Sequence, residues 1–212
     1  MIRLISRFLF LLILSSVTLS ANENTFSERL SKVDIPDKFQ LEEIMIGNKN
    51  AKIHLIIYSS FTCPYCREFH RNELKKFIKE YVNTGIVKVS LRCYLDDQGA
   101  MEAAQITRCL CDGSLDKYMR LYNAVYEQQI DWLKSKDPAE FLKNIFVKLG
   151  FSRRKIEDSL KRTDIGAGLM LEQKRAMHQL GLFSMPAFIV KDRVHVGKIE
   201  YEQLKDLCGC GK

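Results

Sequence analysis

Two cysteines separated by two residues have the spacing that most directly indicates chemistry in this chain. Cys63, Pro64, Tyr65 and Cys66 form a Cys-x-x-Cys motif. A gap of two residues allows one helical turn to bring both sulfur atoms together, so the pair can alternate between dithiol and disulfide. We therefore predict a redox dithiol that exchanges disulfides with other proteins.

The segments on either side of the motif predict how the cysteines are positioned. Residues 53–58 form a short apolar run rich in isoleucine, which is typical of a central strand, and residues 67–81 carry apolar side chains at roughly helical spacing. Pro64 suits the first helical turn, because a proline needs no N–H partner there. Cys63 then takes the N-cap, where unpaired N–H groups and the helix dipole favour a thiolate and lower its pKa.

Two other functions are compatible with the spacing of this Cys-x-x-Cys motif. The motif would be half of a structural zinc site if a second pair of ligands approached it, and the only comparable clusters are two Cys-x-Cys pairs. It would also serve as a passive structural disulfide. The strand before the motif and the helix after it favour the redox function over both.

The first twenty residues have the pattern of a secretory signal peptide. Two arginines precede the apolar run of residues 8–14, and small and polar residues follow it. The run is shorter than the roughly 20 residues that span a bilayer, which favours a signal over a retained anchor. We expect cleavage near Ser20 or Ala21 and a lead-in over residues 21–41. Export would place the cysteines in an oxidising compartment, where disulfides persist.

Composition and charge exclude several other functions. Of the 212 residues, 46% are hydrophobic and 28% charged, which is ordinary for a globular protein with a real core. The formal net charge of +7 comes from scattered lysines and arginines rather than a basic stripe, so we expect no nucleic-acid partner. No phosphate loop, nucleotide fingerprint or His-rich motif is present, and we expect neither cofactor nor metal. His70 is expected to be packed or at the surface.

The remaining pattern predicts an α/β chain in which helices interrupt a strand–helix–strand unit. An edge strand is expected within residues 40–46 and a strand parallel to the central one over residues 86–91. Strands return at residues 186–190 and 194–196, before a last helix over residues 201–207. Between them, helices are expected to begin near Gly99, Ser114, Asp137, Ser152 and Thr163.

The motif and a second stretch near the end together resemble thioredoxin-fold proteins of the DsbA class. That stretch runs from Gly181 to Val190 and contains Met185-Pro186. The resemblance covers residues 42–207. It implies a cis Met185–Pro186 peptide beside the cysteines, where neighbouring backbone groups remain free to pair with an extended substrate.

The same resemblance implies a fold and a function. The fold is a thioredoxin core, residues 42–95 and 179–212, interrupted by an inserted helical domain over residues 96–178. The function is that of a thiol–disulfide oxidoreductase that introduces disulfide bonds into reduced or unfolded exported proteins and is reoxidised by a membrane partner of the DsbB kind. Together with the signal-like first twenty residues, the resemblance leads us to expect an exported, periplasmic, monomeric protein. The alternatives are an isomerase or reductase, or a chaperone or metal-handling binding module with little turnover.

Two positions depart from the DsbA-class pattern. Tyr65 stands where such oxidases often have histidine, and Ile57 stands where the family commonly has a buried carboxylate. Loss of the histidine removes one stabiliser of the reduced thiolate. We therefore predict a milder oxidant, in which Cys63 is attacked by the substrate and the more buried Cys66 resolves trapped adducts.

Five cysteines lie outside the motif, and with seven in total at least one is unpaired within the chain. A second, structural disulfide within this group is expected, with its connectivity open. The alternative is a thiolate metal site formed by the two Cys-x-Cys pairs. The five residues are Cys93, Cys109, Cys111, Cys208 and Cys210.

Overall fold

The computed structural model describes residues 36–191 and 193–211. The expected signal peptide and most of the expected lead-in lie outside these residues. In chain order the elements are η1 (Asp37–Phe39), β1 (Ile44–Ile46), β2 (Ile53–Ser59), α2 (Pro64–Phe69), η2 (His70–Leu74), α3 (Lys75–Phe77), η3 (Ile78–Val82), β3 (Val87–Cys93), α4 (Gln98–Leu110), α5 (Leu115–Glu127), α6 (Gln129–Leu133), α7 (Pro138–Lys148), α8 (Arg153–Leu160), α9 (Thr163–Leu180), β4 (Ala187–Val190), β5 (Arg193–Val196) and α10 (Tyr201–Cys208).

The described strands form one mixed sheet in the order β1-β3-β2-β4-β5. The central strand is β2, as its apolar run predicts, and it pairs parallel to β3 and antiparallel to β4. The expected edge strand is β1, which is shorter than predicted and pairs antiparallel to β3. The parallel strand, helix, strand unit and the later antiparallel hairpin confirm the predicted α/β fold class.

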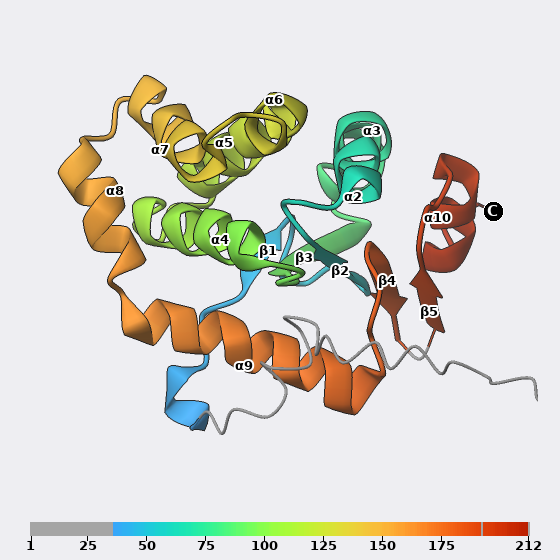
Figure 1. The fold of residues 1–212 in the computed structure, drawn as a ribbon. Coiled ribbons are helices and arrows are strands. Elements are labelled where there is room, and N and C mark those ends of the chain that lie inside the picture. Colours follow the sequence, from blue (N-terminus) through green and yellow to red (C-terminus); the bar gives the residue numbers. More distant parts are fainter. Residues whose placement is uncertain (1–35, 192, 212) are drawn as a thin grey trace, which may run out of the picture.

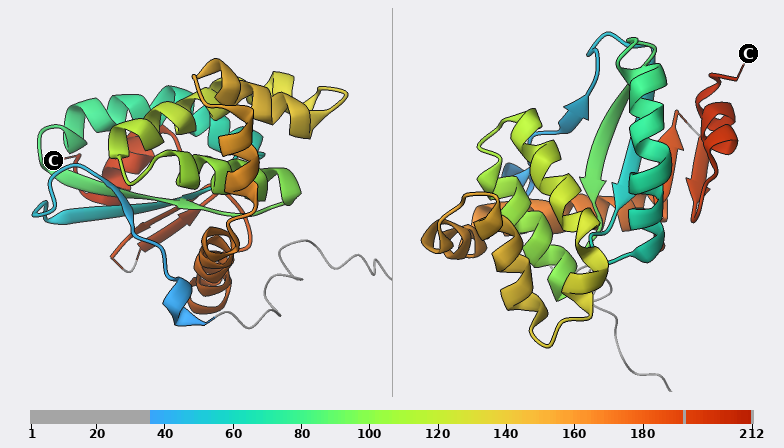
Figure 2. Two further views of the ribbon diagram at one scale, coloured as in Figure 1. Left: turned by 90° about the vertical axis from the view of Figure 1, so that its left-hand side faces the viewer. Right: turned by 90° about the horizontal axis from the view of Figure 1, so that it is seen from above.

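One long helical segment, α2 to η3, follows β2 and packs above the sheet (Figures 1 and 2). Two of its turns, η2 and η3, are π-helical, a variation that the sequence pattern does not announce. Phe77 and Leu74 point into the core, as the predicted apolar stripe requires. The segment ends before Gly85, whose positive φ of 79° suits a residue without a side chain.

Helices α4 to α8 gather beside the sheet, next to the end from which α2 begins (Figures 1 and 2). Three of their starts are predicted by local capping, since the side chains of Ser114, Asp137 and Ser152 each accept a hydrogen bond from the N–H three residues on. The short helix α6 is not predicted by the sequence pattern. It carries Trp132, which is buried in the core as expected.

Helix α9 lies below the sheet and connects the gathered helices to β4 (Figures 1 and 2). The chain just before β1 crosses this helix closely at Gly168. A Cβ atom at that position would lie 2.5 Å from both the Phe39 carbonyl oxygen and Leu41 Cγ, so only glycine fits the crossing. The helix ends at Gly181, which has a φ of 62°.

No helix within residues 36–191 and 193–211 is both long enough and apolar enough to cross a bilayer.

Candidate active site

Cys63 occupies the N-cap of α2, as its position before Pro64 predicts. Its backbone is extended, with φ −77° and ψ 123°, and Pro64 takes the first helical position. The Cys63 sulfur accepts a hydrogen bond from the Cys66 backbone N–H at 3.3 Å. The helix therefore places one of its own unpaired donors directly on the Cys63 sulfur.

The two thiols of the motif differ strongly in acidity. Hydrogen bonding from the Cys66 thiol and from the backbone N–H groups of Cys66 and Tyr65 outweighs partial burial and lowers the pKa of Cys63 to about 7. Cys66 is fully buried, and burial together with the neighbouring Cys63 raises its pKa well above the ordinary value. Near neutral pH the pair therefore holds its negative charge on the more accessible sulfur.

The Met185–Pro186 peptide is cis and lies beside this sulfur, as the resemblance implies. The Cys63 thiol donates to the Met185 carbonyl at 3.5 Å, although 122 residues separate the two in the chain. The Pro186 carbonyl is already used, because it accepts from the Gly197 N–H at 2.8 Å. The sulfur therefore sits between the start of α2 and the segment that enters β4.

Exposed aromatic side chains occur on both of the segments that meet at Cys63. Tyr65 and Phe183 are both largely exposed, and Phe183 stands in the segment that leads to the cis peptide. Ile57 is buried in β2, so an apolar side chain stands where the family commonly has a buried carboxylate. Asp96, which follows β3, places a negative charge near the pair. This charge raises the pKa of both cysteines, by less than burial or hydrogen bonding shifts them.

Side chains from α5 and α6 hold the loop before Cys63, a role that the sequence does not announce. Tyr126 donates its hydroxyl hydrogen to the Ser60 carbonyl at 3.0 Å. Gln129 donates from Nε2 to the carbonyls of Phe61 and Cys63, at 2.7 and 3.0 Å. The tyrosine spacing on α5 predicts a core position, whereas a lone glutamine gives no signal of a partner 66 residues earlier.

His70 is packed rather than placed in the site, which agrees with expectation. It is buried, and its ring stacks on Tyr126 with centroids 4.8 Å apart. Burial lowers the pKa of His70 to about 4, so the ring is neutral at physiological pH.

The other five cysteines lie in three places, and all seven cysteines of the chain are thiols in this structure. Cys93 is buried at the end of β3, with its sulfur 3.7 Å from the Tyr118 hydroxyl. The side chains of Cys208 and Cys210 hydrogen-bond to each other, and burial raises the pKa of Cys208 to about 12. A second disulfide therefore stays a prediction.

The four-thiol metal site, the alternative for these residues, is not assembled. The sulfurs of Cys109 and Cys111 point to different carbonyls, those of Ser159 and Arg108. They lie at the end of α4, well apart from the end of α10 that carries the other pair (Figure 1). Over the described part of the chain, no three His, Cys, Asp or Glu side chains gather as metal ligands.

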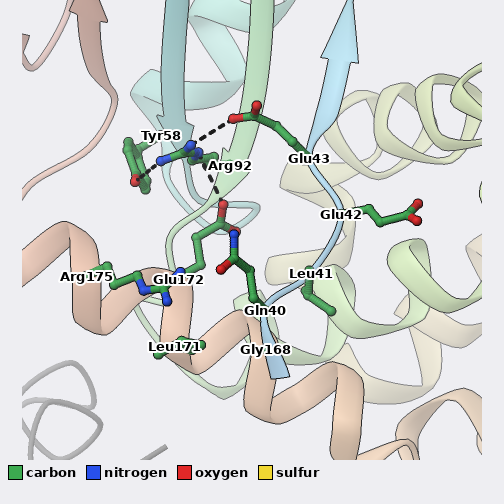
Figure 3. A pocket seen from close by; sticks show the side chains of 10 residues that line it. All are labelled: Gln40, Leu41, Glu42, Glu43, Tyr58, Arg92, Gly168, Leu171, Glu172 and Arg175. Carbon is green, nitrogen blue, oxygen red and sulfur yellow. Dashed lines mark hydrogen bonds and ion pairs between the residues drawn. The ribbon is translucent and has the colours of Figure 1, made fainter. Parts of the chain in front are cut away.

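A second polar cluster lies on the face of the sheet that α9 covers. Arg92 on β3 donates to the Tyr58 hydroxyl at 2.8 Å and pairs with Glu43 at 2.7 Å and Glu172 at 3.4 Å (Figure 3). These residues line a cavity of about 310 Å³. Burial outweighs the nearby guanidinium and raises the pKa of Glu172 to about 7. We call this set the Arg92 cluster.

Comparison with known proteins shows which family this sequence resembles. The sequence model of a family described as thioredoxin matches residues 40–208. A Rickettsia conorii protein named as a candidate protein-disulfide oxidoreductase is 24% identical over 174 residues, which cover 82% of this chain but 62% of that protein. A Rickettsia prowazekii protein with the same kind of name is also 24% identical, and the match covers 56% of it. The chain thus spans less than two thirds of the length of these relatives.

Solved structures share the fold. Alpha-DsbA1 of Wolbachia pipientis superposes with a TM-score of 0.71 at 21% identity, covering 85% of this chain and 95% of that chain. Oxidised BdbD from Bacillus subtilis superposes with a TM-score of 0.68 at 16% identity, covering 82% and 94%. The predicted DsbA-like arrangement, with helices added to a thioredoxin sheet, is confirmed as the fold.

Proposed function

The chain belongs to the thioredoxin family, and from that premise we propose that it is a thiol–disulfide oxidoreductase whose reactive pair is Cys63 and Cys66. The observation that carries this proposal is the Cys63 sulfur at the N-cap of α2, with a pKa of about 7, beside a buried partner thiol. An acidic, accessible thiol next to a less acidic one is the arrangement that disulfide exchange needs.

The exchange proceeds in two balanced steps. A substrate thiolate attacks the Cys63 sulfur of the oxidised pair, forming a mixed disulfide and releasing Cys66, which takes up a proton because its pKa is high. A second substrate thiolate then attacks the substrate sulfur of the mixed disulfide and releases Cys63 as a thiolate. The substrate loses two electrons and two protons and gains a disulfide, and the Cys63/Cys66 pair is reduced.

We assign the oxidising direction to this pair. The acidity of Cys63 makes it a good leaving group, which favours transfer of the disulfide to the substrate. Tyr65 stands in place of a histidine, so one group that would stabilise the reduced thiolate is missing. We therefore propose an oxidant milder than the strongest members of the DsbA class.

The exposed surface around the pair would receive an extended polypeptide. Tyr65 in the motif and Phe183 two residues before Met185 offer exposed apolar surface, and the Met185 carbonyl lies 3.5 Å from the Cys63 sulfur. Peptides that pair with such a segment use main-chain hydrogen bonds for affinity and side-chain contacts for selectivity. Reduced or unfolded proteins are therefore the proposed substrates.

The cellular setting is part of the same proposal. The signal-like pattern of residues 1–20 supports export to the periplasm, and catalytic turnover there needs a reoxidant, which we assign to a membrane partner of the DsbB kind. We also propose that residues 42–95 and 179–212 act as the thioredoxin-like core and that residues 96–178 act as an inserted helical domain.

A glutathione equilibrium and two activity assays test the proposal. We expect the Cys63/Cys66 pair to equilibrate with glutathione, to oxidise a dithiol peptide, and to do so faster than it reduces insulin. A Cys109→Ser variant serves as the matched control, because Cys109 is half-buried and outside the motif. A protein that binds peptides but turns over neither substrate would be a binding module, and the proposed function would be wrong.

A further inference from the structure

Gln129 connects the gathered helices to the loop that carries the reactive cysteine. It lies on α6 with only 2% of its surface exposed. Both of its amide hydrogens are used, since Nε2 donates to the Phe61 carbonyl at 2.7 Å and to the Cys63 carbonyl at 3.0 Å. One side chain therefore binds the carbonyls on both sides of Thr62, the residue directly before the N-cap.

Tyr126 binds one more carbonyl of the same loop. Its hydroxyl, at the end of α5, donates to the Ser60 carbonyl at 3.0 Å, and the ring is wholly buried. In return Arg67, on the first turn of α2, donates from Nε to the Tyr126 carbonyl at 3.2 Å. The corner between α5 and α6 is thus tied to the loop before the motif and to the helix after it.

The loop matters because the orientation of the Cys63 sulfur depends on its backbone. The sulfur accepts the Cys66 N–H at 3.3 Å and lies 3.5 Å from the Met185 carbonyl. Both contacts need the extended backbone of the N-cap, with ψ near 123°. A loop free to rotate would turn the sulfur away from the helix terminus for part of the time. The weakened N–H contact would then raise the pKa of Cys63, because that contact favours the thiolate.

We propose that Gln129 is a positioning residue for Cys63, holding the carbonyls of Phe61 and Cys63 so that the sulfur stays on the helix terminus. Tyr126 supports the same loop through Ser60. The inference rests on the proposed function of Cys63 as the attacked sulfur, and it assigns part of the reactivity of the motif to a residue outside the thioredoxin sheet.

Gln105 is a matched control for a glutamine that only stabilises the fold. It lies on α4, with 6% of its surface exposed. Its Nε2 donates to three carbonyls, those of Ser159, Leu160 and Arg162, at 2.9, 3.1 and 3.1 Å. The chemistry and burial match those of Gln129, but the bonded segment joins α8 to α9 rather than leading to a cysteine.

The test compares Gln129→Met with Gln105→Met in the full chain. Each substitution removes amide donors and keeps a side chain of similar length. The readout is the rate at which iodoacetamide alkylates Cys63 in the reduced protein across a pH series, with the modified peptide identified by mass spectrometry. We expect the Gln129→Met midpoint to rise by about one pKa unit, the effect of about one net hydrogen bond, so alkylation at pH 6 falls about tenfold. Gln105→Met should leave the midpoint unchanged.

Three outcomes decide the matter. Equal midpoints in the wild type and in a folded Gln129→Met variant would overturn the inference while leaving the proposed function intact. An ordinary midpoint in the wild type, near that of a free thiol, would overturn both. If Gln129→Met does not fold, Tyr126→Phe decides instead. It removes one hydroxyl and should raise the midpoint by a smaller amount, and no change in that variant would overturn the inference.

Discussion

The motif end of β2 and the Arg92 cluster on the other face of the same sheet each hold a group whose pKa is about 7. Cys63 reaches that value from above, because hydrogen-bond donors favour its charged form. Glu172 reaches it from below, because burial disfavours its charged form despite the nearby Arg92. One environment makes a charge easier to hold and the other makes it harder, so a shifted pKa alone does not identify reactive chemistry.

The two regions differ in the solvent access of the group with the shifted pKa and in the chemistry of that group. The Cys63 sulfur is partly exposed beside the Met185 carbonyl, whereas Glu172 on α9 is held by its ion pair with Arg92 on the sheet. A thiolate can attack or leave, while a carboxylate already paired with a guanidinium is a structural charge. The comparison therefore predicts catalytic effects at one end and stability effects at the other.

The largest difference should come from removing each group. Cys63→Ser should lower the rate of insulin reduction and of peptide oxidation to the uncatalysed rate, because serine cannot form a disulfide. Glu172→Gln should leave both rates unchanged, since the carboxyl lies outside the proposed exchange path. Undiminished turnover in Cys63→Ser would contradict the assignment of the attacked sulfur.

A second experiment sharpens the difference between the two motif cysteines. Cys66→Ala leaves the acidic sulfur but removes its resolving partner, so mixed disulfides with exported proteins should accumulate. Non-reducing gels before and after addition of a reductant measure this. Cys93→Ala, which removes another buried thiol, should trap none. A Cys66→Ala variant from which no adduct is recovered would count against the two-step exchange.

The pH dependence of stability should then separate the carboxylates of the Arg92 cluster. Because the pKa of Glu172 is higher in the folded protein than its ordinary value of 4.5, its contribution to stability is complete below about pH 4.5 and is lost as pH rises through about 7. Glu172→Gln removes this loss. With 27% of the side chain still exposed, we expect a gain of about 1–2 kcal/mol in unfolding free energy at pH 8.

Glu43 provides the control of opposite sign. Burial would raise its pKa, but hydrogen bonds from Arg92 and Ser90 outweigh burial and lower it. Its contribution to stability is therefore present above its ordinary pKa and is lost as pH falls. Glu43→Gln should destabilise the protein at neutral pH, as measured by urea unfolding. A gain in stability for both variants would show that the cluster is net repulsive rather than balanced by Arg92.

The smallest effect is expected at the third motif position. Tyr65→His places a titratable ring next to the Cys63 sulfur, and its positive form favours the thiolate. Because the side chain at this position is exposed, we expect the Cys63 alkylation midpoint to fall by about half a unit. Tyr65→Phe should leave the midpoint in place. A rise in the Tyr65→His midpoint would contradict the reason given for the milder oxidant.

The parts of the fold that local chemistry determines could be predicted from the sequence. The N-cap at Cys63 and the caps at Ser114, Asp137 and Ser152 depend on residues within one turn, and all four are confirmed. The central strand follows from an apolar run with few alternatives. The neighbourhood of Met185 came only from the resemblance, because nothing local links it to a cysteine 122 residues earlier.

The parts that depend on distant partners could not be predicted. Gln129 has no periodicity or motif around it, and its role appears only when α6 meets the loop before Cys63. The Arg92 cluster likewise joins charges from β3, α9 and the segment before β1, each of which looks like an ordinary surface charge in its own window. A five-residue helix such as α6 also falls below the length at which periodicity is informative.

The contact between the Cys63 sulfur and the Met185 carbonyl bears on how this protein matures. A ribosome synthesises the two motif cysteines first, and the segment that completes the site emerges 122 residues after Cys63. During that interval the nascent chain contains both motif thiols but lacks the Met185–Pro186 segment that lies beside them in the folded protein. Under the proposed function, the pair becomes competent for exchange only after this late segment has been synthesised and has folded against it.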